Sequence, residues 1–173
     1  MGEKIVIAIL AMLTLTTGCY LPISGRVIDA ETNQPIEGAV VLVEWTKTIG
    51  YGLTRTESYK VIEVLSDKEG HYDLPGCYSP FVNSPDVLVY KIGYVAWNNK
   101  LIFPKYEKRS EYQWRNNDIY KMQKFKSEYS INAHMNFIDD IVLSGNLEQK
   151  KLMIKALQLE KEKAFEERRS RNN

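Results

Sequence analysis

Cysteine and histidine are scarce in this sequence, and their scarcity excludes several kinds of site. The 173 residues contain two cysteines and two histidines. A catalytic zinc centre needs three protein ligands around an open position, yet neither His71 nor His134 belongs to a His-x-x-Glu pattern. The chain also lacks Cys-x-x-Cys and the Gly-x-Ser-x-Gly turn of a nucleophilic serine. We therefore expect no catalytic site, no metal site and no cofactor apart from the covalent lipid considered below.

A surplus of charge of one sign is also missing. The sequence has 23 Lys and Arg against 22 Asp and Glu, a net charge of +1. The balance is uneven along the chain, because residues 20–97 carry 6 basic against 10 acidic residues, whereas residues 98–126 carry 8 against 3. Nucleic-acid-binding domains usually show a larger and more coherent basic surplus. A nucleic-acid partner is therefore not expected.

Only one long apolar run is present, and it lies at the N-terminus. Lys4 precedes the apolar residues 5–15. As a helix these eleven residues would span about 16 Å, roughly half of a ~30 Å hydrocarbon core. This pattern predicts the core of a signal peptide over residues 1–18 rather than a membrane span.

The end of that segment resembles a bacterial lipoprotein signal, in which small residues precede a lipid-modified cysteine. Gly18 and Cys19 match that motif. The resemblance implies cleavage before Cys19, a lipid on its sulfur, an acylated amino group, and a short tether over residues 19–22. The membrane would then be a partner through the lipid, and several acyl chains together give durable anchoring. The alternative is an ordinary secretory signal with an incidental cysteine.

The anchor would place the protein in the bacterial cell envelope. In a Gram-negative cell we expect the outer membrane, facing the periplasm. With Cys19 lipidated, Cys77 is the thiol that remains, so no internal disulfide is expected. Cys77 follows Pro75-Gly76 at a turn, where we expect partial burial as a small apolar side chain, with an intermolecular bridge as the alternative.

Short β-prone runs separated by turn residues fill the next hundred residues. Residues 24–45 are expected to form a hairpin with which the later strands pair, its turn marked by Pro35 and Gly38. The dense apolar run 39–45 predicts a strand covered on both faces. Expected strands lie at 23–28, 39–45, 59–65, 71–74, 86–92, 94–103 and 118–125, with loops at 46–58 and 104–117. About seven short strands at this spacing are typical of a β-sandwich.

After Ser127 the pattern becomes helical. Apolar residues recur at helical spacing between Ser130, an expected N-cap, and Gly145, an expected C-terminal stop. Asn146 followed by Gln149 resembles a capping box that opens a second helix, whose charged end is expected to fray. We expect an α-helical hairpin over residues 127–173, packed either on the sandwich or between subunits.

Three separated pieces resemble one family, the carboxypeptidase regulatory-like domain. They are Gly25–Val41, the turn and strand Ser66–Pro75, and the late strand Val87–Tyr94. The resemblance implies a mainly β fold, namely a seven-stranded Greek-key β-sandwich of the transthyretin (prealbumin) type over residues 23–126. It also implies a non-catalytic module. The C-terminal helical hairpin lies outside the family pattern.

Aromatic residues in polar loops are the candidates for binding. Tyr51 lies in a Gly-rich loop, and Tyr112 and Trp114 lie in a second polar loop. Planar rings on exposed loops stack on sugars or form protein-binding patches; ordinary packing is the alternative. Trp45 and Trp97 are on expected strands and are assigned to the core.

The stretch from Asp67 to Asp73 has acidic residues at short spacing around Gly70, as a calcium loop does. Lys68 interrupts the acidic set, and no distal bidentate Glu follows. We therefore expect a structural turn there, with calcium as the alternative.

Together these observations predict a non-catalytic, lipid-anchored cell-envelope protein that acts as a protein- or glycan-binding module. The alternative is a structural subunit of an envelope assembly that self-associates through its C-terminal helices. The sequence leaves the oligomeric state open.

Overall fold

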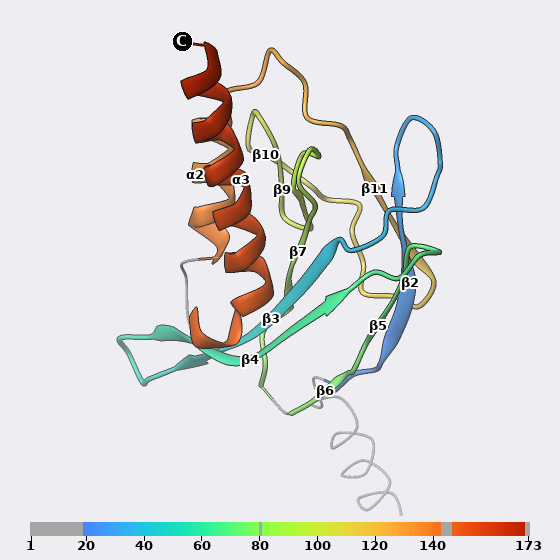
Figure 1. The fold of residues 1–173 in the computed structure, drawn as a ribbon. Helices are drawn as coiled ribbons and strands as arrows, with labels where there is room; N and C mark the ends of the chain where they lie inside the picture. The colour runs from blue at the N-terminus through green and yellow to red at the C-terminus, as the bar shows by residue number, and fades with distance from the viewer. Residues whose placement is uncertain (1–18, 80, 143–146, 172–173) are drawn as a thin grey trace, which may run out of the picture.

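The computed structural model describes residues 19–79, 81–142 and 147–171 (Figure 1). The signal peptide expected over residues 1–18, the expected helix stop at Gly145 and the expected cap at Asn146 lie outside the described residues.

The described chain is mainly β, with helices at its C-terminal end. Its elements in chain order are β1 (Cys19–Tyr20), β2 (Ile23–Asp29), β3 (Val40–Ile49), β4 (Arg55–Leu65), β5 (His71–Leu74), β6 (Cys77–Tyr78), β7 (Asp86–Tyr90), β8 (Trp97–Asn98), β9 (Leu101–Ile102), β10 (Glu107–Lys108), β11 (Asp118–Met122), α2 (Ile131–Val142), the 3₁₀ turn η1 (Leu147–Gln149) and α3 (Lys151–Arg171). None of the described helices combines the length and the apolar character needed to cross a bilayer.

Two sheets form the body of the fold. A three-stranded sheet has the order β11-β2-β5, and a four-stranded sheet has the order β4-β3-β7-β8. β11 runs parallel to β2, whereas the other pairs in these sheets are antiparallel. Two short ribbons, β1-β6 and β10-β9, add to this body.

The main core lies between the two sheets. Alternate residues of each strand point into it, such as Val27 of β2, Tyr72 of β5 and Tyr120 of β11 from one sheet. Val43 of β3 and Val89 of β7 meet them from the other sheet, and both are fully buried. Each buried aliphatic side chain of this size contributes about 1.5–3 kcal/mol to folding. The two sheets are therefore held face to face by apolar burial.

A second core lies on the opposite face of the four-stranded sheet, under the helices (Figure 1). Leu42 and Leu88 point away from the first core and pack with Phe137 and Ile138 of α2 and Met153 of α3. β3 is consequently buried on both faces, which confirms the expectation from its dense apolar run. It also places the C-terminal helices on the sheet of their own chain.

Polar contacts fix the helices to the sheet. The Glu63 carboxylate of β4 accepts hydrogen bonds from the backbone N–H groups of Leu152 and Met153, both at 2.8 Å. These donors belong to the first turn of α3 and have no partner within the helix. At the start of α2, the hydroxyl of Ser130 accepts the N–H of Ala133, which confirms Ser130 as an N-cap.

The prediction of a hairpin over residues 24–45 is wrong, because its two strands do not pair with each other. β2 pairs with β11 and β5, whereas β3 pairs with β4 and β7, so the two strands lie in different sheets. The chain turns away after β2 because Asp29 Oδ1 accepts the N–H groups of Glu31 and Thr32, both at 2.9 Å. The residues that follow then cross to the other sheet.

Other boundaries also differ from the expected ones. The strand expected over 94–103 is broken into β8 and β9, because Asn98 Oδ1 accepts the N–H groups of Lys100 and Leu101 and turns the chain. The loop expected over 46–58 shrinks to five residues, since β3 and β4 extend the hairpin to Ile49 and Arg55. The expected tether 19–22 begins as strand β1.

Candidate binding groove between two edge strands

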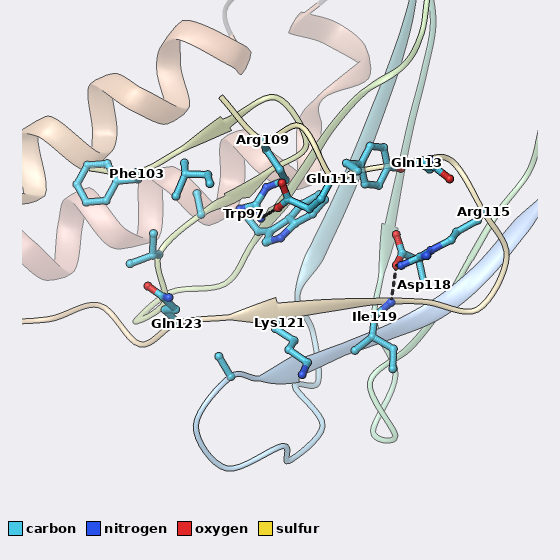
Figure 2. A pocket seen from close by; sticks show the side chains of 15 residues that line it. Trp97, Phe103, Arg109, Glu111, Gln113, Arg115, Asp118, Ile119, Lys121 and Gln123 are labelled. Carbon is cyan, nitrogen blue, oxygen red and sulfur yellow. Dashed lines mark hydrogen bonds and ion pairs between the residues drawn. The ribbon is translucent and has the colours of Figure 1, made fainter. Parts of the chain in front are cut away.

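A groove of about 470 Å³ opens between β11 and the region of β8, the edge strands of the two sheets. The loop over residues 103–117 covers one side of it. Figure 2 shows Trp97, Arg109 and Glu111 gathered on one side, with Ile119, Lys121 and Gln123 following β11 along the other. A cleft of this size is in the range that small ligands or single peptide side chains occupy.

The alternation of β11 determines which of its residues face solvent. Tyr120 and Met122 point into the main core, whereas Ile119 and Lys121 are exposed. Successive side chains of a strand point to opposite faces. Ile119 and Lys121 are therefore left to border the groove.

On its groove side, β11 pairs with no strand that the structure describes. Of the strands that the structure describes, β2 alone pairs with β11. One residue beyond the strand, the carbonyl of Gln123 accepts the N–H of Val95 at 2.7 Å, on the edge away from β2. Backbone groups two residues apart in a strand point to the same side, so the N–H and C=O of Lys121 and the C=O of Ile119 face the groove, whereas the N–H of Ile119 donates to Asp118 Oδ1.

Arg109 is held rigidly over Trp97. Its guanidinium carbon lies 4.8 Å from the centroid of the indole, a cation–π arrangement. Nε donates to the carbonyl of Asn98 at 2.9 Å, and Nη1 donates to Glu111 Oε1 at 2.8 Å. The backbone N–H of Glu111 itself, together with the Arg109 guanidinium, lowers the pKa of the Glu111 carboxyl. Glu111 is therefore ionised at neutral pH.

A second charged pair closes the other end of the groove. Arg115 Nη2 lies 3.4 Å from Asp118 Oδ1, which also accepts the N–H of Ile119 at 3.0 Å. Among the described residues, the Lys121 ammonium forms no ion pair. The two arginines are thus matched by acids, and Lys121 supplies a cation without a counter-charge at the groove.

Three tyrosines lie beneath the groove. Tyr72 and Tyr120 stack with centroids 5.2 Å apart, and the hydroxyls of Tyr112 and Tyr120 are 3.5 Å apart. Burial raises the pKa of Tyr112 to about 12 and raises those of Tyr72 and Tyr120 further. These phenols keep their protons at neutral pH, so they form an uncharged aromatic floor and do not act as acids or bases.

The three aromatic residues predicted for binding are not brought together. Tyr112 lines the groove beside Trp97, with ring centroids 5.5 Å apart. Trp114 packs on Trp45 at 5.4 Å and is part of the main core's border. Tyr51 is fully exposed at the tip of the β3–β4 hairpin.

Sequence reasoning missed three groove residues: Trp97, Arg109 and Lys121. Trp97 was assigned to the core, and it does pack against the core while its side chain also lines the groove. The basic surplus over residues 98–126 was the available signal, because Arg109, Arg115 and Lys121 all come from that segment.

The remaining residues singled out in the sequence lie in turns, in the core or on a strand. Asp67 Oδ1 accepts the N–H groups of Glu69 and His71 at 3.0 and 2.7 Å, as expected for a structural turn. Cys77 is buried against the main core, at 1% exposure. Within the described ranges, no three His, Cys, Asp or Glu side chains are grouped as metal ligands. Cys19 opens β1.

No protein-family model and no curated relative matches the sequence. Among solved structures, the chain is similar to a streptococcal ancillary pilin with 16% identity and a TM-score of 0.32. The match covers 60% of this chain and 29% of the pilin, so the chain spans less than a third of that protein. A TM-score this low carries over neither fold nor function.

Proposed function

We propose that this chain is a non-catalytic, lipid-anchored binding module of the bacterial cell envelope, and that the groove beside β11 binds an extended segment of a protein partner. The fold proposed for the module is the seven-stranded Greek-key sandwich of the carboxypeptidase regulatory-like family. The seven strands of the two facing sheets support that assignment, as do the three sequence pieces that resemble the family.

The observation that carries the proposal is the unpaired edge of β11 beside a groove. An exposed strand edge with alternating pockets is the surface to which an extended peptide adds as a further strand. Lys121 adds a cation without a counter-charge, which favours an acidic side chain on the peptide. The backbone gives affinity in this arrangement, and the side-chain pockets give selectivity.

A glycan is the less favoured ligand because the large ring at the groove is already covered. The Trp97 indole contacts the Arg109 guanidinium on one side, and the Tyr120 ring lies 4.4 Å from it centroid to centroid. A sugar platform needs an open aromatic face. Tyr51 offers an open ring, but it lies at the hairpin tip and not at the groove.

The binding test uses two changes at one position. A photo-crosslinking residue at Ile119 should capture one partner in intact envelopes. Lys121→Pro removes a backbone N–H from the unpaired edge and leaves the β2 ladder intact, and Lys121→Glu reverses the charge; each should reduce capture about tenfold or more, a loss of about 1.4 kcal/mol. Lys105→Glu, on an exposed loop position, is the matched control. Capture that survives both changes and is competed by oligosaccharide would replace the protein partner by a glycan.

The anchor has its own test. The wild-type chain should incorporate labelled palmitate, and Cys19→Ala should not. If the substitution and a globomycin-type block of signal cleavage both leave the protein unchanged, the lipid anchor is wrong, whatever the groove binds.

Self-association through the C-terminal helices is the second candidate. Leu159 and Phe165 of α3 are exposed, and Phe165 borders a 350 Å³ hollow with Ile131 and Met135 of α2. Most of the apolar surface of α2 is used on its own sheet, which leaves a small interface. Light scattering on the full chain in detergent, with Phe165→Ser as the variant, separates the two: a monomer in both forms would exclude this candidate.

A further inference from the structure

The chain next to Cys19 is fastened to the body of the domain. β1 pairs with β6, so that Cys19 is opposite Tyr78. The Tyr20 ring packs on Trp45 and Trp114, with centroids 6.3 and 5.8 Å away. The carbonyl of Leu21 accepts the indole N–H of Trp114 at 3.1 Å. The proposed lipid-bearing residue is therefore joined directly to the fold, without a flexible linker.

The most exposed apolar side chains gather at the same end of the molecule. Among the residues that the structure describes, six large apolar side chains are at least 63% exposed: Leu21, Tyr51, Leu53, Tyr78, Phe81 and Phe165. The first five lie in β6, in the segments beside β1 and β6, and at the tip of the β3–β4 hairpin. Figure 1 places β6 and that hairpin tip at its lower end and the C-terminal end of α3, which carries Phe165, at its upper end.

These segments are joined to one another. After β6 the chain reaches Phe81 and then bridges the outer half of β3, with Val82 opposite Lys47 and the Asn83 N–H donating to the carbonyl of Thr46 at 2.8 Å. Phe81 is thus placed between the β1–β6 ribbon and the hairpin. Its φ of 62° is rare for a bulky residue, and the residue is 78% exposed.

We propose that this end, here called the anchor face (Leu21, Tyr51, Leu53, Tyr78 and Phe81), lies in the interfacial layer of the membrane that holds the lipids of Cys19. This inference rests on the proposed lipid anchor. A lipid surface fits the face better than a protein does because Leu21 and Tyr78, two residues of the face, adjoin the point where the acyl chains would leave the domain. Tyrosine and apolar side chains are also those that settle at the boundary between headgroups and acyl chains.

We expect the attraction to be apolar rather than electrostatic, because the basic side chains near the face are engaged by other groups of the chain. Lys47 lies 3.8 Å from the centroid of the Tyr59 ring, Arg55 pairs with Glu57 at 2.6 Å, and Lys60 donates to the carbonyl of Gly76 at 2.8 Å. Two separated contacts, the Cys19 lipids and the hairpin tip, fix the tilt of the domain. β9 and β10, beside the groove, then point away from the bilayer (Figure 1).

Spin labels on the full lipidated chain test the inference. In a Cys77→Ala background, single cysteines replace Tyr51, Tyr78 or Phe81. Phe165→Cys is the matched control, because Phe165 lies at the opposite end and its exposure falls between those of Tyr78 and Phe81. The chain is reconstituted in phosphatidylcholine vesicles. The ratio of collisions with oxygen to collisions with a water-soluble nickel chelate should be several-fold higher at the three face positions than at position 165, and high salt should not change it.

A second variant separates membrane contact from folding. Phe81→Gly suits the positive φ and should keep or raise thermal stability, while the collision ratio reported by the Tyr78→Cys label falls. A ratio at the face equal to that at position 165, on a chain that stays bound to the vesicles, overturns the anchor face and leaves the lipid anchor standing. Labels that both reagents reach poorly indicate a covering protein and also overturn it. Loss of the chain from the vesicles in the lipidated form contradicts the proposed function instead.

Discussion

Lys150 and Glu44 form an ion pair whose two side chains are both removed from water. Lys150 Nζ donates to Glu44 Oε2 at 2.7 Å and to the carbonyl of Val142 at 2.9 Å. The pair joins β3 to the start of α3, and the second bond satisfies the last turn of α2. One lysine thus links the sheet and both helices.

Breaking this pair from one side should be costly. Glu44→Leu leaves the Lys150 ammonium buried without its counter-charge, so we expect the free energy of unfolding in urea to fall by about 3–5 kcal/mol. The double variant Glu44→Leu/Lys150→Met removes both charges and should recover most of that loss. A single variant as stable as the wild type would contradict the buried pair.

The cap of α3 should have a smaller and more local effect. Glu63→Ala removes the acceptor for the first N–H groups of the helix, which should cost about 1 kcal/mol. Hydrogen exchange at the amides of Leu152 and Met153 should quicken with it. Glu57→Ala, at a solvent-exposed position of the same strand, is the control and should leave both measurements unchanged.

His134 should make stability depend on pH in a defined window. It accepts the N–H of Ala96 at Nε2, and burial lowers its pKa from 6.5 to about 4. Between those values the unfolded chain binds more protons, so the free energy of unfolding should fall by about 3 kcal/mol as pH drops from 6.5 to 4. Above pH 6.5 the full stability should be present.

A substitution identifies the responsible group. His134→Gln offers an acceptor to Ala96 and does not titrate, so its stability should be flat over this window. Asp29 contributes separately: the Thr32 backbone N–H lowers its pKa from 3.8 to about 2, and its contribution is lost only as pH falls through that lower range. A wild-type curve that is also flat from pH 6.5 to 4 would contradict the role of His134.

Gly25 should control the position of β11. A Cβ at this residue would collide with the carbonyl oxygen of Asp118 and the hydroxyl of Tyr72. Gly25→Ala should therefore cost about 1–3 kcal/mol, alter the near-UV signal of the stacked tyrosines and weaken capture at Ile119. Ser24→Ala on the same strand loses only an exposed hydrogen bond to Asn116 and should leave capture intact.

Local sequence patterns predicted where the strands lie better than which strands pair with one another. His71–Leu74 was predicted with both ends correct, because its alternation and the flanking Gly70 and Pro75 are local signals. The pairing of β2 with β11 could not be predicted in the same way, since it joins distant parts of the chain. It depends on the close approach at Gly25 and on the packing of Tyr72 against Tyr120.

The candidate groove was predictable in part. Tyr112 stood out as an aromatic residue in a polar loop, and the groove does include it. Arg109 gains its position from Trp97 and Asn98, which precede it by about ten residues and meet it only after β8 and β9 turn the chain back. The sequence shows such a contact only as a surplus of basic residues, because the contacting residues are not related by a regular spacing.

Because β3 is buried on both faces, we expect the two sheets and the helices to unfold as one cooperative unit. Val41 and Val43 belong to the core between the sheets, whereas Val40 and Leu42 belong to the core under the helices. Deleting residues 127–173 would uncover a continuous apolar sheet face, and such a face drives aggregation. The helices therefore cannot be removed to give a smaller soluble domain, and a protease cut between β11 and α2 should destabilise the sheets as well as the helices.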